Sequence, residues 1–253
     1  MIVTFLEGIS VKRPSARHCR AVGAALAKLH LASADFPMRR PNALSLAGWC
    51  HAQRSVYNWA EDIPQSQALA QTLAEKAAEL SADDPIVLAV LGAVHTFVRN
   101  HGTARVLLER AVALDPNAAW AWSRLGWLDN YSDRPSEAIE KFERAMRLSP
   151  LDPMNFNNYV GLASAHEVAE DYDKAVALYR RGLEERPHAV WIYRNLASSL
   201  SGAGRMEEAK EAYALMMSSY PDMTVSRYRQ AMVFSAAALD RMVENLRKLG
   251  LPD

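Results

Sequence analysis

Apolar side chains recur along most of the chain at spacings of three and four residues, the pattern of helices that bury one face. The pattern falls into segments of similar length, and each segment closes on a proline. The closing prolines are Pro85, Pro116, Pro150, Pro187 and Pro221, at intervals of 31, 34, 37 and 34 residues. Because proline cannot continue a helix, the pattern predicts pairs of helices stacked in series.

The segment that ends at Pro150 shows the positions that the segments share. If its closing proline is numbered 32, small residues fall at positions 8 and 20, and large apolar residues fall at 4, 7 and 24. In chain order these positions hold Trp122, Leu125, Gly126, Ala138, Phe142, Ala145 and Pro150. Small residues let the two helices of a pair cross closely, so Gly126 is expected to meet Ala138. Asp129 stands at position 11, where the pattern calls for an aromatic residue.

These positions resemble the signature of the tetratricopeptide repeat (TPR). The resemblance implies an all-α fold, a right-handed superhelical solenoid of about five helix pairs with N- and C-terminal capping helices. The expected repeat domain covers residues 49–253. Its units are expected at about 54–85, 85–116, 119–150, 153–187 and 190–221, with a C-terminal cap at 222–253.

Several short signals predict where individual helices begin. The Asp-Pro pairs at 84–85, 115–116 and 152–153 combine a capping residue with a proline suited to a first turn. Ser235 is expected to cap a final helix that runs to about Leu249. The fourth unit carries three extra residues, 151–153, and these are expected to lengthen its first helix by about one turn.

Charge and cysteine content limit the partners and the cellular compartment that the sequence favours. Lys plus Arg and Asp plus Glu number 29 each, so the net charge is zero and gives no electrostatic reason to bind nucleic acid or an anionic membrane. The two cysteines, Cys19 and Cys50, have no partner at metal-ligand spacing, which favours a reduced, cytoplasmic setting. No histidine has a His or Cys partner three or four residues away. Neither a metal site nor a cofactor is therefore expected.

From about Trp49 onward the chain resembles the C-terminal TPR region of bacterial class III adenylate/guanylate cyclases. The resemblance rests on CHAQRSVYNWAED (50–62), AWSRLGWLDNY (121–131), LSPLDPMNFNNYVG (148–161) and ALDRMVENLRKLGLP (238–252). It implies a sensor or partner-binding appendage. It does not imply cyclase activity, because the catalytic domain of that family precedes the repeats and is not expected within this chain.

Residues 1–48 are similar to an internal fragment of bacterial homoserine kinases of the aminoglycoside-phosphotransferase fold. The segment Phe5 to Gly8 would be the hinge between the two lobes, and His18 to Leu31 would be the first helix of the second lobe. None of the seven histidines starts a His-x-Asp motif, and no metal-binding aspartate motif follows. Kinase activity is therefore not expected. Residues 15–33 are instead expected to form a helical N-terminal cap, or else a loosely held relic of a gene fusion.

Candidate binding residues lie on the first helix of each unit, which lines the concave face of a TPR solenoid. Aromatic and arginine side chains concentrate binding energy at protein interfaces, so such residues on this face are favoured as contacts. The predicted peptide- or partner-binding residues are Trp120, Arg124, Trp127, Asn130, Tyr131, Asn157, Trp191, Arg194 and Asn195. The alternative is that the tryptophans only fill space between neighbouring units.

These observations predict a non-catalytic module that binds a protein or peptide on its concave face. Two alternatives stay open. The chain is a homodimerising regulatory tail of a cyclase-type signalling protein, or it is a vestigial fusion of kinase and cyclase fragments without activity. No catalytic residue, metal, nucleic acid or membrane partner is expected.

Overall fold

The computed structural model describes residues 43–57, 59–80 and 83–253, which belong to one compact unit, Pro41–Asp253. These residues form helices and contain no strand, which confirms the all-α expectation. The α-helices are α2 (Ala43–Val56), α3 (Ile63–Leu80), α4 (Pro85–Phe97), α5 (His101–Leu114), α6 (Ala119–Tyr131), α7 (Pro135–Leu148), α8 (Asn155–Val168), α9 (Tyr172–Glu185), α10 (Tyr193–Gly202), α11 (Met206–Ser219), α12 (Val225–Ala231) and α13 (Ala236–Arg247). A short 3₁₀ turn, η1 (Val190–Ile192), precedes α10.

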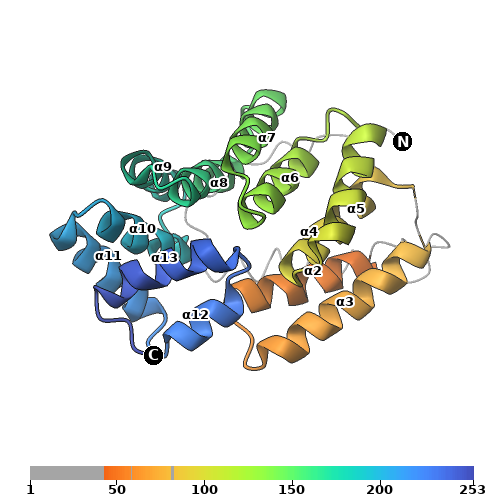
Figure 1. Cartoon of the computed structure of the whole chain (residues 1–253). Coiled ribbons are helices and arrows are strands. Elements are labelled where there is room, and N and C mark those ends of the chain that lie inside the picture. Colours follow the sequence, from red (N-terminus) through yellow and green to blue (C-terminus); the bar gives the residue numbers. More distant parts are fainter. Residues whose placement is uncertain (1–42, 58, 81–82) are drawn as a thin grey trace, which may run out of the picture. The chain divides into compact units, whose positions relative to one another are not determined.

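The helices pack as five consecutive pairs, α2/α3 to α10/α11, which follow one another in chain order (Figure 1). Contacts between α2 and α4, α4 and α6, and α6 and α8 bring the first helices of successive pairs together. The fold is therefore a TPR-type solenoid. The inner face is lined mainly by the first helices of the pairs.

Four of the five pairs are joined by the same tight turn, at residues 98–100, 132–134, 169–171 and 203–205. The middle residue of each turn has a left-handed backbone conformation, with φ between 60° and 75°. The following residue then donates its N–H to a carbonyl five residues earlier, which closes the C-terminus of the first helix. The left-handed residues are Arg99, Asp133, Glu170 and Gly204.

Close crossing of the paired helices depends on small side chains, as the repeat pattern predicts. The alanines at position 20 of the second to fifth units are completely buried: Ala104, Ala138, Ala175 and Ala209. A side chain at Gly126 would approach the Phe142 ring to 2.9 Å. Gly126 was expected to meet Ala138 of α7. The nearest side chain is instead that of Phe142, which lies on the same helix.

The first pair does not begin where the sequence indicated. The expected unit was 54–85, but Arg54 lies in the last turn of α2, and the pair occupies 43–80. Its close crossing uses Gly48, whose added Cβ would lie 3.2 Å from the Ala70 carbonyl oxygen. The longer connection, residues 57–62, moves the small residues of α3 out of register with the other units, which explains the error.

Of the three Asp-Pro pairs expected to start helices, the first does so and the other two do not. Asp84 does cap α4, because its carboxylate accepts from the N–H groups of Ile86 (2.8 Å) and Val87 (3.3 Å). Asp152 instead accepts from the Met154 N–H at 2.8 Å and stabilises a turn before α8. The extra residues 151–153 therefore extend the connection and not the helix. Asp115 likewise lies in a turn, and α6 begins at Ala119.

Asp129 is buried although its repeat position favours an aromatic residue. Its carboxylate is 2.7 Å from the Arg105 guanidinium and 2.8 Å from that of Arg134. Burial raises the pKa of this carboxyl, and Arg105 opposes the shift. The two arginines supply the compensation that a buried charge requires.

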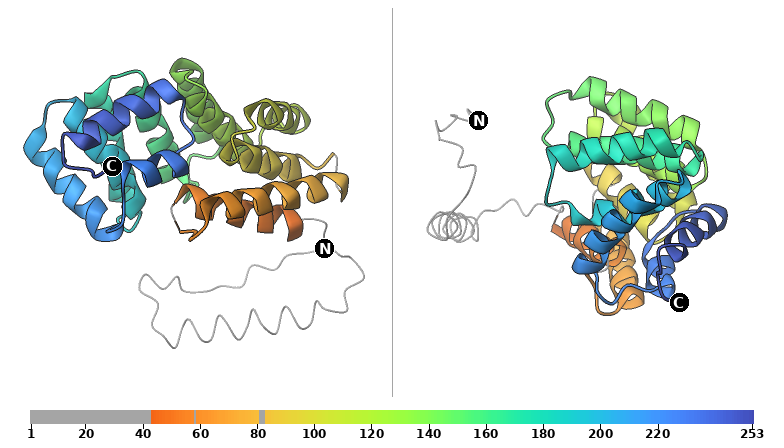
Figure 2. Two further views of the ribbon diagram at one scale, coloured as in Figure 1. Left: turned by 60° about the horizontal axis from the view of Figure 1, so that its bottom comes forward. Right: turned by 90° about the vertical axis from the view of Figure 1, so that its left-hand side faces the viewer.

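The C-terminal helices α12 and α13 end the solenoid. Ser235 caps α13, with its hydroxyl accepting from the Ala238 N–H at 3.2 Å. The helix packs against α10 (Figure 2) and ends at Arg247, close to the expected Leu249. The expected N-terminal helix at 15–33 and the kinase-like segment 1–48, apart from its last residues, lie outside the described residues.

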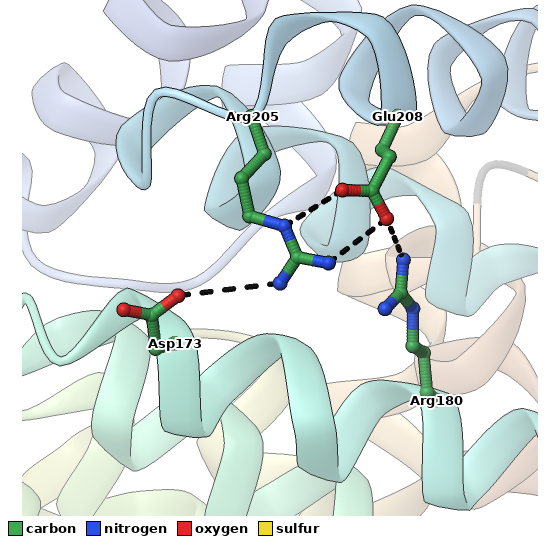
Figure 3. A network of polar contacts seen from close by, with 4 residues as sticks. All are labelled: Asp173, Arg180, Arg205 and Glu208. Atoms are coloured by element: carbon green, nitrogen blue, oxygen red, sulfur yellow. Dashed lines mark hydrogen bonds and ion pairs between the residues drawn. The ribbon is translucent and has the colours of Figure 1, made fainter.

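A charge network joins the outer helices of the last two pairs (Figure 3). Glu208 on α11 accepts two hydrogen bonds of 2.8 Å from Arg205 and also pairs with Arg180 of α9. Hydrogen bonds from Arg205 and Arg180 lower the pKa of Glu208 to about 2. The network lies on the exposed side of these helices, so it adds little stability for its number of charges.

No helix among the described residues is long and apolar enough to cross a bilayer.

Candidate partner-binding site

The nine residues predicted to bind a partner lie on α6, α8 and the η1–α10 segment. Trp120 is the most exposed of them, at 37%. Asn157 and Trp191 are half-buried. The other six are buried: Arg124, Trp127, Asn130, Tyr131, Arg194 and Asn195.

Seven of the nine line one partly enclosed cavity of about 30 Å³. The exceptions are Trp120 and Asn130. The cavity draws its walls from α2, α4, α6, α8, α9, the η1–α10 segment and the chain after α12. Its lining comprises Val56, Tyr57, Phe97, Arg124, Trp127, Tyr131, Asn157, Val160, Ser164, Tyr179, Trp191, Arg194, Asn195, Met232 and Phe234.

The chain itself covers the inner face at this level, where an accessible peptide groove was expected. Phe234, in the segment between α12 and α13, packs edge-on against Tyr131 with 4.8 Å between ring centroids. On the opposite side, the end of α2 contributes Val56 and Tyr57. The cover comes from residues outside the regular repeat positions, and for this reason the repeat pattern did not reveal it.

Arg124 has no carboxylate partner among the described residues. Its Nη2 lies 3.4 Å from the Ser123 hydroxyl. With the Asn157 amide oxygen turned toward it, Nη2 also donates to that oxygen at 2.6 Å, and Trp127 Nε1 donates to the same oxygen at 3.2 Å. Within the described part of the chain, the Nε of Arg124 has no hydrogen-bond partner. Burial lowers the pKa of this guanidinium, opposed by Tyr57 and Tyr131.

Arg194 is buried more completely, with 2% of its surface exposed. Its Nη1 donates to the Val56 carbonyl at 3.0 Å, and its Nε donates to the Trp191 carbonyl at 3.2 Å. These bonds tie α10 to the end of α2, 138 residues earlier in the chain. Within the part of the chain that the structure describes, no acidic side chain pairs with this guanidinium either.

The two phenols beside these arginines are neutral at ordinary pH. Burial raises the pKa of Tyr57 and of Tyr131, and the charges of Arg124 and Arg194 oppose both shifts. Both arginines and both tyrosines line the same cavity. The cavity wall is therefore cationic.

Partly exposed aromatic side chains adjoin the cavity, and we call them the aromatic rim: Trp49, Tyr57, Trp59, Trp120 and Trp191. Trp49 meets Trp120 edge-on with 5.8 Å between ring centroids, and Tyr57 lies 4.9 Å from Trp59 and 5.2 Å from Trp191. The Arg124 guanidinium lies 5.4 Å from the Trp120 ring centroid. The rim therefore combines aromatic surface with a cation just beneath it.

Two predicted residues act within the fold. Asn130 donates from its amide to the Gly161 carbonyl at 2.8 Å and so joins α6 to α8. Asn195 donates to Glu167 at 3.1 Å, and Glu167 also accepts from the Tyr179 hydroxyl at 2.7 Å. Burial raises the pKa of Glu167, although these hydrogen bonds oppose the shift. Both asparagines therefore satisfy buried polar groups.

The sequence pattern missed Trp49, Met232 and Phe234 as contributors to the site. Trp49 precedes the expected first unit, and the other two follow the last one. An indirect signal existed, because Met232, Val233 and Phe234 form a short apolar run between two polar helices. No cluster of three or more His, Cys, Asp or Glu side chains suited to a metal occurs among the described residues.

Comparison with known proteins agrees with the fold. Residues 169–233 match the family model for the tetratricopeptide repeat. Among solved structures, the type IV pilus biogenesis factor PilW is similar with a TM-score of 0.57 and 17% identity. The alignment covers 82% of this chain and 93% of PilW. At this identity the likeness concerns the fold alone.

A second likeness is to homoserine kinases, as the sequence indicated. The chain is 57% identical over 76 residues to that of Methylobacterium nodulans, which is 30% of this chain and 22% of the kinase. It is 60% identical over 62 residues to that of Mesorhizobium japonicum, which is 24% of this chain and 18% of the kinase. The chain thus spans about a fifth of the length of these relatives.

Proposed function

We propose that this chain is a non-catalytic interaction module that binds a protein or peptide at the aromatic rim and the adjoining concave face. The TPR-type fold supports the general role, because stacked helix pairs offer an extended surface for partners. The observation that carries the specific proposal is the exposed aromatic surface of Trp59 and Trp120 next to the cationic cavity. Exposed tryptophans backed by an arginine are typical of the residues that concentrate binding energy.

The proposed contacts divide into two groups. Trp120 and Trp191 have accessible surface and would touch the partner directly, together with Asn157 at the cavity wall. Arg124, Trp127, Asn130, Tyr131, Arg194 and Asn195 are buried by the chain and would support the rim from below. A partner that reached these buried residues would first have to displace Met232 and Phe234.

Site-specific photo-crosslinking tests the proposal. A photoreactive phenylalanine would replace Trp120, Trp191 or Trp122 in the full chain, expressed in its native cell. Trp122 is the matched control, because it lies on the same helix as Trp120 but packs under Arg144, with 3.9 Å from the guanidinium to the ring centroid. Crosslinks from positions 120 and 191 to one common protein, but not from 122, would support the rim. Crosslinking from 122 alone would place the interface elsewhere.

Self-association is a second candidate, as expected of a regulatory tail of the cyclase type. The observation that favours it is an exposed apolar corner between α7 and α8, where Leu151 is 93% and Met154 51% exposed. Multi-angle light scattering of the full chain and of a Leu151→Ser, Met154→Ser variant would separate the two candidates. A dimer that the variant loses supports self-association through this corner, and a monomer at every concentration excludes it.

The likeness to homoserine kinases leads to no proposal of phosphoryl transfer. That reaction needs a positioned base and metal ligands around the transferred group, and the sequence contains neither motif. The remaining alternative, a fusion fragment without any role, predicts no partner at any crosslinking position.

A further inference from the structure

The wall of the cavity contains two buried arginines that pair with no acidic side chain of the described residues. Arg124 and Arg194 are 6% and 2% exposed, and both line the cavity. Among the described residues that line the cavity, none is acidic. Tyr57 and Tyr131 supply no negative charge, because burial raises the pKa of each phenol. Burying an unpaired charge is costly, so the fold needs a compensating group at this place.

One hydrogen-bond donor in the same wall, Arg124 Nε, lacks a partner among the described residues. The Ser164 hydroxyl, on a side chain that is 1% exposed, lies in this wall beside the Tyr179 hydroxyl. Orphaned buried donors are rare in folded proteins and indicate a missing acceptor. The free volume of about 30 Å³ exceeds the roughly 10–15 Å³ of probe-occupied space that one water needs. A water molecule or an ion of similar size therefore fits in the cavity.

We propose that this cavity binds one small monovalent anion of halide size, held by the guanidiniums of Arg124 and Arg194 and the hydroxyl of Ser164. A chloride ion accepts hydrogen bonds, carries the opposite charge and is close to water in size. A water molecule would satisfy the donors but would leave the charge uncompensated. Gluconate is far bulkier than chloride, so it serves as the comparison anion. This site is independent of the proposed partner.

The anion would also stabilise the closed inner face. Arg194 holds the end of α2 through the Val56 carbonyl, and Arg124 lies beneath the aromatic rim. One anion between the two guanidiniums reduces their mutual repulsion and offsets part of their desolvation cost in the folded state. Since the site exists only in the folded state, anion binding stabilises the fold by mass action.

Chloride titration of the full chain tests the site. Sodium gluconate is exchanged for sodium chloride at constant ionic strength while Tm is followed, and ³⁵Cl NMR line width reports binding directly. Tm is expected to rise by about 3 °C, and the chloride signal is expected to broaden. Indifference of both readings to chloride would overturn the proposal.

Variants localise the effect. Arg124→Met with Arg194→Met is expected to abolish the chloride dependence, whereas Arg147→Met, which removes an exposed arginine, is expected to keep it. Ser164→Ala retains both charges and tests the site if the double variant folds poorly. Its chloride affinity is expected to fall about tenfold.

Two results would contradict the assignment. Chloride dependence that persists in the folded double variant would place the anion elsewhere. Stabilisation by formate but not by chloride would show that the cavity selects a carboxylate instead of a halide.

Discussion

The Arg99 guanidinium donates a hydrogen bond of 2.6 Å to the Met232 carbonyl, 133 residues later in the chain. The same Nη2 donates to the Arg229 carbonyl at 2.8 Å. Arg99 belongs to the turn between α4 and α5, and these carbonyls belong to the C-terminal end of α12 and the residue that follows it. This contact fastens the segment that covers the inner face. A cation at this helix end also complements the helix dipole.

Replacement of Arg99 should therefore loosen the cover. Arg99→Ala is expected to lower the free energy of unfolding by about 1–2 kcal/mol, because the charge-assisted bonds to two carbonyls are lost. Hydrogen exchange at residues 229–234 should accelerate more than elsewhere. Arg110→Ala, which removes an exposed pair with Asp83, is the control and should change little. Equal effects of the two variants would contradict the role of Arg99.

Gly161 provides space for an aromatic ring from the preceding unit. A Cβ at Gly161 would overlap the Phe142 ring, and Phe142 is itself completely buried. Gly161→Ala is expected to destabilise the fold by about 1–3 kcal/mol through overpacking. Gly102→Ala is the matched control, since no described residue outside its own helix turn lies within 4 Å of its added Cβ. Urea denaturation measures both, and a neutral Gly161→Ala would show that α8 can shift away.

The left-handed turn residues predict a stabilising substitution. Asp133 has φ 60°, whereas the equivalent residue of the last turn is Gly204 with φ 75°. Asp133→Gly is expected to raise the free energy of unfolding by about 0.5–1 kcal/mol, because glycine avoids the steric cost of this conformation. Gly204→Ala should lower it by about 1 kcal/mol for the same reason. Thermal unfolding measures both variants. A loss of stability in Asp133→Gly, or a gain in Gly204→Ala, would refute the explanation.

Glu167 predicts a specific pH dependence. Burial raises its pKa in the folded state above the unfolded value, so the folded state binds the proton more tightly. Its contribution to stability is therefore greatest at low pH and declines as pH rises from the unfolded pKa through the raised folded pKa. Glu167→Gln keeps an acceptor for Tyr179 and Asn195 but removes the charge.

The free energy of unfolding of Glu167→Gln should therefore increase relative to that of the wild-type protein as the pH rises from 4.5 to 8. Urea denaturation at several pH values measures this difference. Glu211→Gln, which removes a carboxyl from an exposed position, is measured alongside as the control. A Glu167→Gln difference that does not change with pH would mean that the Glu167 carboxyl is not titrating in this window.

The sequence by itself determined the helix pairs, the small residues at their crossings and the helices that line the inner face. These features follow from local periodicity, because helix faces and closing prolines recur within each unit. Even there, the longer connection in the first pair concealed its boundary, since repeat recognition depends on constant spacing.

Only the tertiary structure decided whether the inner face is accessible. Met232 and Phe234 lie outside the repeats, and their position depends on contacts such as that of Arg99 across the solenoid. The burial of Arg124 and Arg194 follows from this closure. Burial depends on residues far apart in the chain, and a pattern that repeats every unit carries no information about them.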